Sequence, residues 1–328
     1  NNATGIRSGK YGATGNWVHQ IEVVLSNGDI LQTGRISKRE LNRKKGEQTF
    51  EGEVYRGIDN LITDNADVIA NSIDTEVRDG AGYTGIAEVK HRDGSIDLTP
   101  LIIGSQGTLG IISEVIMKAE FYSELAVAAI AFGSWESARD TLEAIAGLEP
   151  SVLELIDGGM FESALAQGKK YAFYEDASEA GATNAVLLVG FDDSSERHRN
   201  KRLKKLAKLL DQTDAFVSFG ADSTSAEALL ALRDVTSVIV TPEGATGSTP
   251  PLVDGAYIPF NRFEDFMTSL ETLGKKYHLV LPIYGRVLDN TYHVRPTFQL
   301  SKVTDRQKII KFTDEYARLV ASHGGHLI

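Results

Sequence analysis

The stretch PLIIGSQGTLGIISEVIMK, residues 100–118, decides how the rest of the sequence is interpreted. It places a glycine-rich turn between two apolar segments, which predicts a strand, a turn and a second strand. Three glycines recur at every third position of the turn: Gly104, Gly107 and Gly110. Glycine permits a positive φ and the close approach of another group. Ser105, Thr108 and the N–H groups of the turn are donors that suit a phosphate or a sugar, although a plain hairpin turn is the alternative.

Residues 104–112, GSQGTLGII, resemble the GSEGTLGI segment of FAD-linked oxidases of the vanillyl-alcohol oxidase superfamily, which have a PCMH-type FAD-binding domain. The D-lactate dehydrogenase and glycolate oxidase branch is the most similar. In that family the segment closes the FAD domain and lies along the cofactor, and Gln106 stands here in place of its acidic residue. The resemblance implies a set of FAD contacts: Gly104, Ser105, Gln106, Gly107, Thr108, Gly110, Ile111 and Ile112.

A second segment, NATGIRSGKYG at residues 2–12, has neither a helical nor a strand period and predicts a structured loop. It resembles the NASGxRSxKYG segment of the same family, whose first four residues pass close to the flavin ring and the pyrophosphate. The corresponding positions here are Asn2, Ala3, Thr4 and Gly5. We therefore expect this loop to lie beside the turn at 104–112.

The composition bounds the class of protein. A chain of 328 residues is long enough for two domains, and its 42% hydrophobic and 24% charged residues are typical of a soluble globular protein. The net charge of -11 argues against a nucleic-acid partner, because phosphate binding needs a basic surface. Without cysteine there are no disulfides, thiolate zinc sites or iron–sulfur clusters, which fits the cytoplasm. We find no membrane span, signal peptide or internal repeat.

The first domain is expected over residues 1–119 as an α+β sheet domain, the second subdomain of a PCMH-type FAD-binding domain. Residues 17–33 alternate around Asn27-Gly28, the strongest short signal of a hairpin, and 52–72 has the period of an amphipathic helix. No G-x-G-x-x-G follows a strand and opens a helix, so a doubly wound dinucleotide fold is excluded. Turns are expected at 79–83 and 91–94.

The second domain is expected over residues 120–328, where strands and helices alternate. This pattern predicts a ferredoxin-like cap domain, with an antiparallel sheet covered on one face by helices. SVLELID, residues 151–157, resembles the A-x-E-L-M-D segment that opens the cap domain of the family. Ser134 and Asn261 are predicted helix caps, and 241–252, rich in Gly, Pro, Ser and Thr, is predicted as a connector or lid.

The segment GRVLDNTYHVRP, residues 285–296, brings together two arginines, an acid and a histidine, which is unusual for a plain hairpin. It resembles the family pattern G-H-x-G-D-G-N-x-H-x-R-P, in which the two histidines can hold a divalent metal. Arg286 replaces the first histidine, so we expect no metal here and a direct contact of Arg286 with a substrate carboxylate. A structural loop with a hydrogen-bonded His293 is the alternative.

Arg233 ends the apolar helical stretch AEALLALR, at a position where the family has L-W-x-x-R and an arginine that holds the substrate carboxylate. A charge at a helix C-terminus is the alternative interpretation. The resemblance thus implies five residues that bind substrate or act in catalysis: Arg233, Arg286, Asp289, His293 and Arg295. His323 and His326 are expected to be solvent-exposed.

The resemblance implies an FAD-dependent oxidoreductase that oxidises a 2-hydroxy acid of the lactate or glycolate type, with hydride transfer to flavin N5 and His293 as the base. An electron-transfer partner would then accept the electrons. The family's glycine-rich pyrophosphate lobe and its final acid-and-histidine segment have no counterpart here, so we expect a fragment that binds FAD poorly and is inactive alone. A lyase-like synthase of the same superfamily and a non-catalytic binding module are the alternatives.

Overall fold

The computed structural model describes the chain in five stretches: residues 2–73, 82–121, 123–237, 253 and 255–328. The chain forms two compact units. A short segment, Ile6–Lys10, belongs to the second unit although the residues on either side of it belong to the first. The first unit comprises Asn1–Gly5 and Tyr11–Phe121, and the second comprises Ile6–Lys10 and Tyr122–Ile328. The predicted turn at 79–83 and the predicted connector at 241–252 lie partly or wholly outside the described residues.

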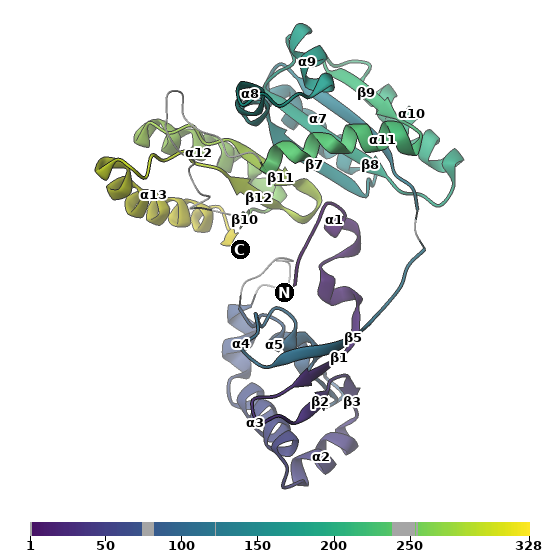
Figure 1. Ribbon diagram of the computed structural model, residues 1–328, viewed down its shortest axis with the longest axis vertical. Helices are drawn as coiled ribbons and strands as arrows, with labels where there is room; N and C mark the ends of the chain where they lie inside the picture. Colours follow the sequence, from purple (N-terminus) through teal and green to yellow (C-terminus); the bar gives the residue numbers. More distant parts are fainter. Residues whose placement is uncertain (1, 74–81, 122, 238–252, 254) are drawn as a thin grey trace. The chain divides into compact units, whose positions relative to one another are not determined.

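The first unit contains an antiparallel sheet in the order β2-β1-β5 (Figure 1). Its strands are β1 (Val18–Val24), β2 (Ile30–Gln32) and β5 (Ile111–Met117), and a second small sheet pairs β3 (Arg35–Ile36) with β4 (Ile96–Asp97). The predicted hairpin is confirmed: β1 and β2 pair directly, and Gly28 N–H donates to the Leu25 carbonyl at 2.9 Å to close the turn.

Helices pack against these sheets and complete the core of the first unit. They are α2 (Lys38–Gly46), α3 (Phe50–Asp64), α4 (Ala66–Ser72), α5 (Ile86–Val89) and α6 (Thr99–Ile102), with a 3-10 turn η1 at Thr14–Trp17. The helix predicted over 52–72 is therefore two helices. The side-chain amide of Asn65 donates to the Leu61 carbonyl at 2.8 Å, and such a competing bond favours a helix end at Asn65.

The segment before the glycine-rich turn was predicted as a strand, and this prediction is wrong. Residues 99–102 form the short helix α6, because the Asp97 side chain accepts a hydrogen bond from Thr99 N–H at 2.8 Å and Pro100 occupies the first turn. The strand after the turn is present as β5. It pairs with β1 along its whole length, so the glycine-rich turn connects a helix to a strand.

The second unit is built on a single antiparallel sheet of eight strands in the order β13-β10-β12-β11-β7-β8-β6-β9. The strands are β6 (Ala126–Phe132), β7 (Val152–Asp157), β8 (Ala185–Phe191), β9 (Phe216–Gly220), β10 (Gly255–Tyr257), β11 (Ile283–Arg286), β12 (Thr291–Val294) and β13 (His326–Leu327). The helices are α1 (Ser8–Tyr11), α7 (Trp135–Ala146), α8 (Gly158–Ala166), α9 (Ala172–Glu179), α10 (Glu196–Leu210), α11 (Ser223–Leu230), α12 (Phe263–Tyr277) and α13 (Val303–Ser322). Three 3-10 turns, η2 (Ala231–Ser237), η3 (Phe260–Arg262) and η4 (Val287–Asp289), complete it.

This sheet consists of two ferredoxin-like halves. In the first, β6, α7, β7, β8, α10 and β9 follow the β-α-β-β-α-β order, and the strands pair as β9-β6-β8-β7. In the second, β10, α12, β11, β12, α13 and β13 repeat the order, with strands paired as β13-β10-β12-β11. The ferredoxin-like prediction is confirmed, and the repeat is structural although none was found in the sequence. β7 and β11 join the halves through three paired positions.

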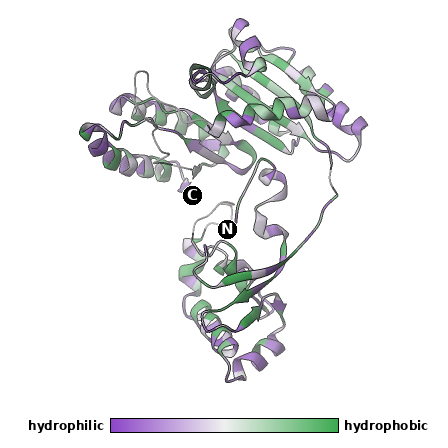
Figure 2. Ribbon diagram, in the orientation of Figure 1, coloured by the Kyte–Doolittle hydropathy of each residue, from purple (hydrophilic) through white to green (hydrophobic). Residues whose placement is uncertain are grey.

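Helices pack against both faces of the sheet. Along β6, Ala128 and Ile130 belong to the core under α7, α10, α12 and α13, whereas Val127 and Ala129 point to a second core under α8, α9 and α11. The expectation of helices on one face only is therefore too simple. Figure 2 shows the central strands in the hydrophobic colour and α2 of the first unit in the hydrophilic one.

Several local expectations for the second unit differ from the structure. Ser134 caps α7 as predicted, with its side chain accepting from Ser137 N–H at 3.1 Å. Asn261 does not cap α12, because it lies within the turn η3 and the helix begins after Arg262. Strand β9 and helix α9 were not predicted, since both are short and of mixed polarity. Among the described residues, no helix has the length and apolarity needed to cross a membrane.

Gly110→Ala is expected to destabilise the first unit by about 2–3 kcal/mol. Gly110 has a φ of +154°, and a Cβ there would lie 2.4 Å from Val23 Cγ1 and 2.7 Å from the Val24 carbonyl oxygen. The matched control is Gly57→Ala in α3, where nothing lies within 4 Å of the added atom. It should be neutral or stabilising by about 0.5–1 kcal/mol. Urea unfolding followed by Trp17 fluorescence in a Trp135→Phe background measures both, and equal effects would contradict the prediction.

A pH dependence of stability is expected from Asp157, which caps α8 by accepting a hydrogen bond from Gly159 N–H at 2.7 Å. Burial raises the pKa of Asp157 to about 6, against the lowering effect of the Gly159 and Ile283 N–H groups. The stability that this shift contributes is present below about pH 4 and is lost as the pH rises through about 6. The loss is at most about 3 kcal/mol. Asp157→Asn should flatten the curve between pH 4 and pH 7, and parallel curves for the two proteins would refute this origin.

Candidate functional site

Polar side chains gather where the two halves of the sheet join. They lie on the face that carries the core under α8, α9 and α11, which we call the second face. Along β11, Ile283 belongs to the core under α12, so Tyr284 and Arg286 alternate in direction with it and lie on the second face. Arg286 pairs in register with Glu154 of β7 and Thr291 of β12. We call this surface the polar face and define it by Glu154, Tyr284, Arg286, Thr291 and His293.

The centre of the polar face is a buried ion pair between Glu154 and Arg233. Glu154 is 0% exposed, although it lies on a strand whose other positions are almost all apolar. Arg233 Nε donates to Glu154 Oε2 at 2.5 Å and NH2 donates to Oε1 at 3.0 Å, which is a two-pronged contact. Burial lowers the Arg233 pKa, but the hydrogen bonds and charge of Glu154 more than offset this, so the pKa is raised.

Tyr284 is the third member of this network. Its hydroxyl donates to Glu154 Oε1 at 2.5 Å and accepts from Arg233 NH2 at 3.2 Å. Burial raises the Tyr284 pKa, and the charge of Glu154 adds to the effect. The phenol therefore stays protonated at neutral pH. The Tyr284 hydroxyl both donates and accepts a hydrogen bond within the network. Tyr284 therefore connects the two charged groups.

His293 lies next to this network on the neighbouring strand. It pairs in register with Tyr284, and the two rings stack with centroids 5.6 Å apart and planes 19° from parallel. On its other side His293 pairs with Gly255, where a Cβ would lie 3.1 Å from the imidazole Cε1. The tyrosine ring and the missing side chain thus fix the plane of the imidazole, and the ring remains partly exposed.

Arg286 and Asp289 form a second charged pair at the end of β11. Arg286 Nε lies 3.4 Å from Asp289 Oδ2, and both residues are buried. Ser8 of α1 donates its hydroxyl hydrogen to the same Asp289 oxygen. Asn290, which follows, has a φ of +56°, the left-handed conformation that asparagine tolerates well and that turns the chain into β12. The carboxylate of Asp289 thus holds both the hairpin and the N-terminal segment.

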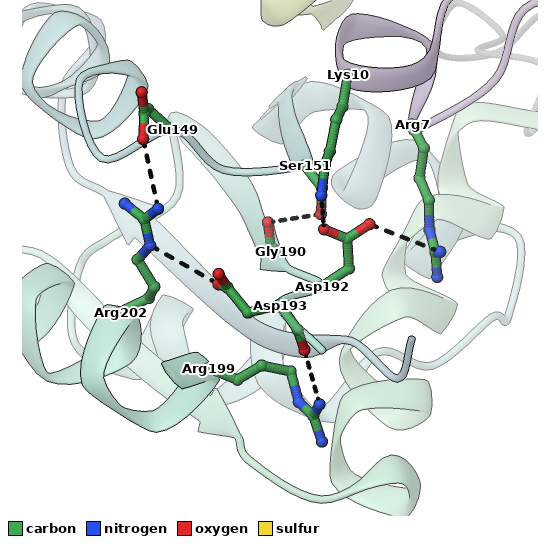
Figure 3. Close-up of polar contacts among 9 residues, drawn as sticks. All are labelled: Arg7, Lys10, Glu149, Ser151, Gly190, Asp192, Asp193, Arg199 and Arg202. Atoms are coloured by element: carbon green, nitrogen blue, oxygen red, sulfur yellow. Dashed lines mark hydrogen bonds and ion pairs between the residues drawn. The ribbon is translucent and has the colours of Figure 1, made fainter. Parts of the chain in front are cut away.

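The segment Ile6–Lys10 is fixed to the second unit at further points. Arg7 NH1 lies 3.9 Å from Asp192 Oδ2, and Lys10 forms an ion pair with the other oxygen of this buried carboxylate (Figure 3). Gly9 approaches Leu288 so closely that a Cβ would lie 2.1 Å from Leu288 Cβ. Glycine is therefore required at this position. The segment 2–12, predicted as a loop, contains the short helix α1.

Arg295 follows β12, and the alternation of that strand puts it on the same side as His293. Its N–H donates to the Pro282 carbonyl at 2.9 Å, which continues the pairing with the segment before β11. The guanidinium Nε is buried, and it has no hydrogen-bond partner in the part of the chain that the structure describes. Arg295 therefore differs from Arg233 and Arg286, each of which has an acidic neighbour.

The structure brings the five predicted residues together on neighbouring elements of the second unit. Glu154 and Tyr284 were missed as site residues, although a signal for one was present. A glutamate at an inward position of the apolar segment SVLELID requires a buried partner, and this could have been paired with an arginine from the sequence. The contact of Ser8 with Asp289 had no signal, because the two residues lie 281 positions apart.

The predicted cofactor residues of the first unit also lie side by side. Asn2 Oδ1 accepts a hydrogen bond from Gly15 N–H at 2.8 Å, and the Ala3 carbonyl accepts from Thr14 N–H at 3.0 Å. A Cβ on Gly104 would lie 3.7 Å from Asn2 Cβ, so the segment 2–5 is adjacent to the glycine-rich turn. This is the arrangement that we expected between the two motifs.

The glycine-rich turn is open to solvent rather than packed in the core. Gln106, Gly107 and Thr108 are exposed, and nothing lies within 4 Å of a Cβ added to Gly107. Gln106 and Gly107 have positive φ angles of 52° and 79°, and turns of this kind can form concave sites for an anion. Thr108 contacts the Tyr83 hydroxyl at 2.5 Å. The residues present thus fit the chemistry of a nucleotide cofactor.

Other expectations concern metals and the last histidines. Among the described residues, no group of three or more His, Asp and Glu side chains could hold a metal ion. His323 is not fully exposed, since its Nδ1 lies 2.8 Å from the Leu319 carbonyl and its Nε2 lies 3.3 Å from Ser269 Oγ. His326, on the edge strand β13, is exposed and lies 6.2 Å from the Tyr257 ring between centroids.

Residues 123–328 match the family described as "FAD linked oxidases, C-terminal domain", which is more than half of the chain. The chain is 23% identical over 334 residues to D-2-hydroxyglutarate dehydrogenase of Pseudomonas putida KT2440, covering 99% of this chain and 33% of that relative. It is 24% identical over 317 residues to glycolate oxidase subunit GlcD of Bacillus subtilis 168, covering 94% and 53%. The chain therefore spans between one third and about half the length of these relatives.

The fold is also similar to that of solved structures. Alkyldihydroxyacetonephosphate synthase superposes with a TM-score of 0.56 at 15% identity, covering 99% of this chain and 52% of that one. At this identity the likeness establishes the fold alone. Together with the family match, it confirms both the α+β architecture and the resemblance to FAD-linked oxidases.

Glu154→Gln is expected to lower the free energy of unfolding of the second unit by about 2–3 kcal/mol, because it leaves the Arg233 charge without its partner. The matched control is Glu162→Gln on α8, an exposed glutamate whose loss should cost less than about 0.5 kcal/mol. Chemical unfolding followed by Trp135 fluorescence in a Trp17→Phe background measures both variants. Equal effects of the two changes would show that the network contributes nothing to stability.

Proposed function

The chain belongs to the FAD-linked oxidases through their C-terminal domain, and from this premise we propose that it takes part in the FAD-dependent oxidation of a 2-hydroxy acid. The names of the relatives support the substrate class, since one is a dehydrogenase of D-2-hydroxyglutarate and another is a glycolate oxidase subunit. Both act on a carbon that carries a hydroxyl group next to a carboxylate. The same two groups are what the polar face is suited to bind.

The observation that carries this proposal is the convergence of cations and one partly exposed histidine on the polar face. Arginines suit a carboxylate because their planar N–H groups match its two oxygens. His293 is held in one plane by Tyr284 and Gly255, so its ring presents a nitrogen in a constant direction. Histidine is the side chain that most often transfers a proton in catalysis, and we assign to His293 the role of the base that takes the hydroxyl proton.

FAD, when bound, would supply the redox chemistry by accepting a hydride at N5 from the substrate carbon. The residues that would hold it are those of the segment 2–5 and of the glycine-rich turn 104–112. Their contribution is to orient the cofactor and to bind its polar groups with backbone N–H donors. The electrons would then pass to a separate electron-transfer partner.

A non-catalytic binding module and a lyase-like synthase are the alternatives to this proposal. A non-catalytic binding module has no need of a buried Glu154–Arg233 pair beside a stacked histidine, so the polar face argues against it. A lyase-like synthase would use the same fold with different chemistry. The two flavin functions differ in one measurable property, since only the oxidoreductase has its flavin reduced by a hydroxy acid.

The test uses the whole polypeptide that carries these residues, with its flavin followed by visible absorption under anaerobic conditions. A 2-hydroxy acid is expected to bleach the flavin band, and His293→Gln should slow the bleaching by about 100-fold or more, as the loss of a general base does. Lys311→Gln, on the exposed surface of α13, is the control. A flavin that no 2-hydroxy acid reduces would overturn the proposal. The 328 residues alone are expected to purify without a flavin band and without activity.

A further inference from the structure

Arg286 of the polar face and its neighbours Arg233 and Arg295 are not equivalent, and the difference indicates what kind of acid the site takes. Arg233 has both oxygens of Glu154 as partners, and Arg286 lies 3.4 Å from a carboxylate oxygen of Asp289. Each of these cations is therefore already balanced by an acidic side chain of the protein. A substrate carboxylate that relied on either would compete with a short internal ion pair.

Arg295 is in the opposite situation. What distinguishes it is that it forms no ion pair within the described residues, and its buried Nε, like that of several other arginines of the chain, has no hydrogen-bond partner there. A buried donor without a partner costs free energy, and native proteins rarely leave one unless a ligand, ion or water satisfies it. The cation and the orphan donor together call for an anion with at least one oxygen acceptor.

The position of Arg295 relative to His293 suits a 2-hydroxy acid. The two residues are separated by one position on the same side of the chain, which puts their Cα atoms about 7 Å apart. In a 2-hydroxy acid the carboxylate and the hydroxyl are on adjacent carbons, a separation that two long side chains can bridge. A carboxylate on Arg295 therefore leaves the hydroxyl within reach of His293.

We infer that Arg295 is the anchor of the substrate carboxylate and that the site prefers acids with a single carboxylate, an inference that rests on the proposed function. A second carboxylate would need a second uncompensated cation at this face. Among the described residues, Arg233 is balanced by Glu154 and Arg286 by Asp289, so Arg295 is the cation here that no acidic side chain balances.

This preference separates the two kinds of relative named above. Glycolate and lactate carry one carboxylate, whereas 2-hydroxyglutarate carries two. A dicarboxylate would have to bury its second charge against Glu154 or Asp289, or pull an arginine out of its internal pair. Selectivity for monocarboxylates thus arises from the cost of an unpaired negative charge rather than from the volume of the site.

The experiment measures acid binding to the 328-residue chain, which requires neither flavin nor turnover. Glycolate, (R)-lactate and (R)-2-hydroxyglutarate are titrated by calorimetry, and the arginine Nε–H signals are followed by ¹⁵N NMR. We expect saturable binding of glycolate and lactate, with 2-hydroxyglutarate at least about 10-fold weaker. The Nε–H signal that is missing from the spectrum of Arg295→Gln should be the one that moves in the unsubstituted chain.

Arg295→Gln should weaken lactate binding by about 10- to 100-fold, the range for losing a charge-assisted hydrogen bond. Arg295→Lys keeps the charge without the planar fork and should fall in between, which also covers the case that the glutamine variant does not fold. Arg318→Gln on the exposed side of α13 is the matched control and should bind as the unsubstituted chain does.

The possible outcomes distinguish the preference for one carboxylate from the role of Arg295. Equal or tighter binding of 2-hydroxyglutarate would overturn the preference for one carboxylate and leave the proposed function standing. Undiminished lactate binding by Arg295→Gln would overturn the anchor alone. Failure of every acid to bind saturably would overturn this inference, whereas the proposed function is overturned separately, by a flavin of the whole polypeptide that no 2-hydroxy acid reduces.

Discussion

The buried carboxylate of Glu154 is the interaction on which the second unit depends. It lies at the junction of two strands, β7 and β11, that come from different ferredoxin-like halves and pair over only three positions. By binding Arg233 from η2 and Tyr284 from β11, Glu154 ties three separate elements to one point. A charge in this position is expensive unless every oxygen is satisfied, and here both are. The hydrogen bond to Glu154 also holds Tyr284, whose ring stacks on the ring of His293 on the next strand.

The sequence predicted the fold to the extent that local patterns determine it. Alternating apolar runs predicted β1, β6, β7 and β8, and serine at position 134 predicted the start of α7 correctly, because these signals are local. The segment at 99–102 was misjudged, since a single side-chain bond from Asp97 was enough to turn an apolar run into a helix. The doubling of the ferredoxin-like half was invisible for a related reason. β6 has seven buried residues and its counterpart β10 only three, so the two halves share a topology and no sequence pattern.

The candidate site was predictable only in part. Residues 285–296 are contiguous, so their arginines, acid and histidine could be read directly from the sequence. Whether an arginine has an acidic partner depends on residues that are distant in the sequence. Glu154 lies 79 positions from Arg233, and Ser8 contacts Asp289 across 281 positions. Long-range pairing of this kind follows from sheet register, which no local motif encodes. The glycine-rich turn was an easier case, because its conformation arises from its own glycines.

The two halves of the second unit, which join through three paired positions of β7 and β11, differ in how their sheets are covered. One half has a sheet enclosed on both sides by helices, and its strand residues are almost all constrained by packing. The other half carries much of its chemistry on the face to which it contributes only Tyr284 of the second core. Substitutions at partly exposed positions of this face cost less stability than substitutions at the buried Thr291 or Tyr257, and new specificities can evolve there. A duplicated architecture of this kind lets natural selection explore substrates on one copy while its twin preserves the scaffold.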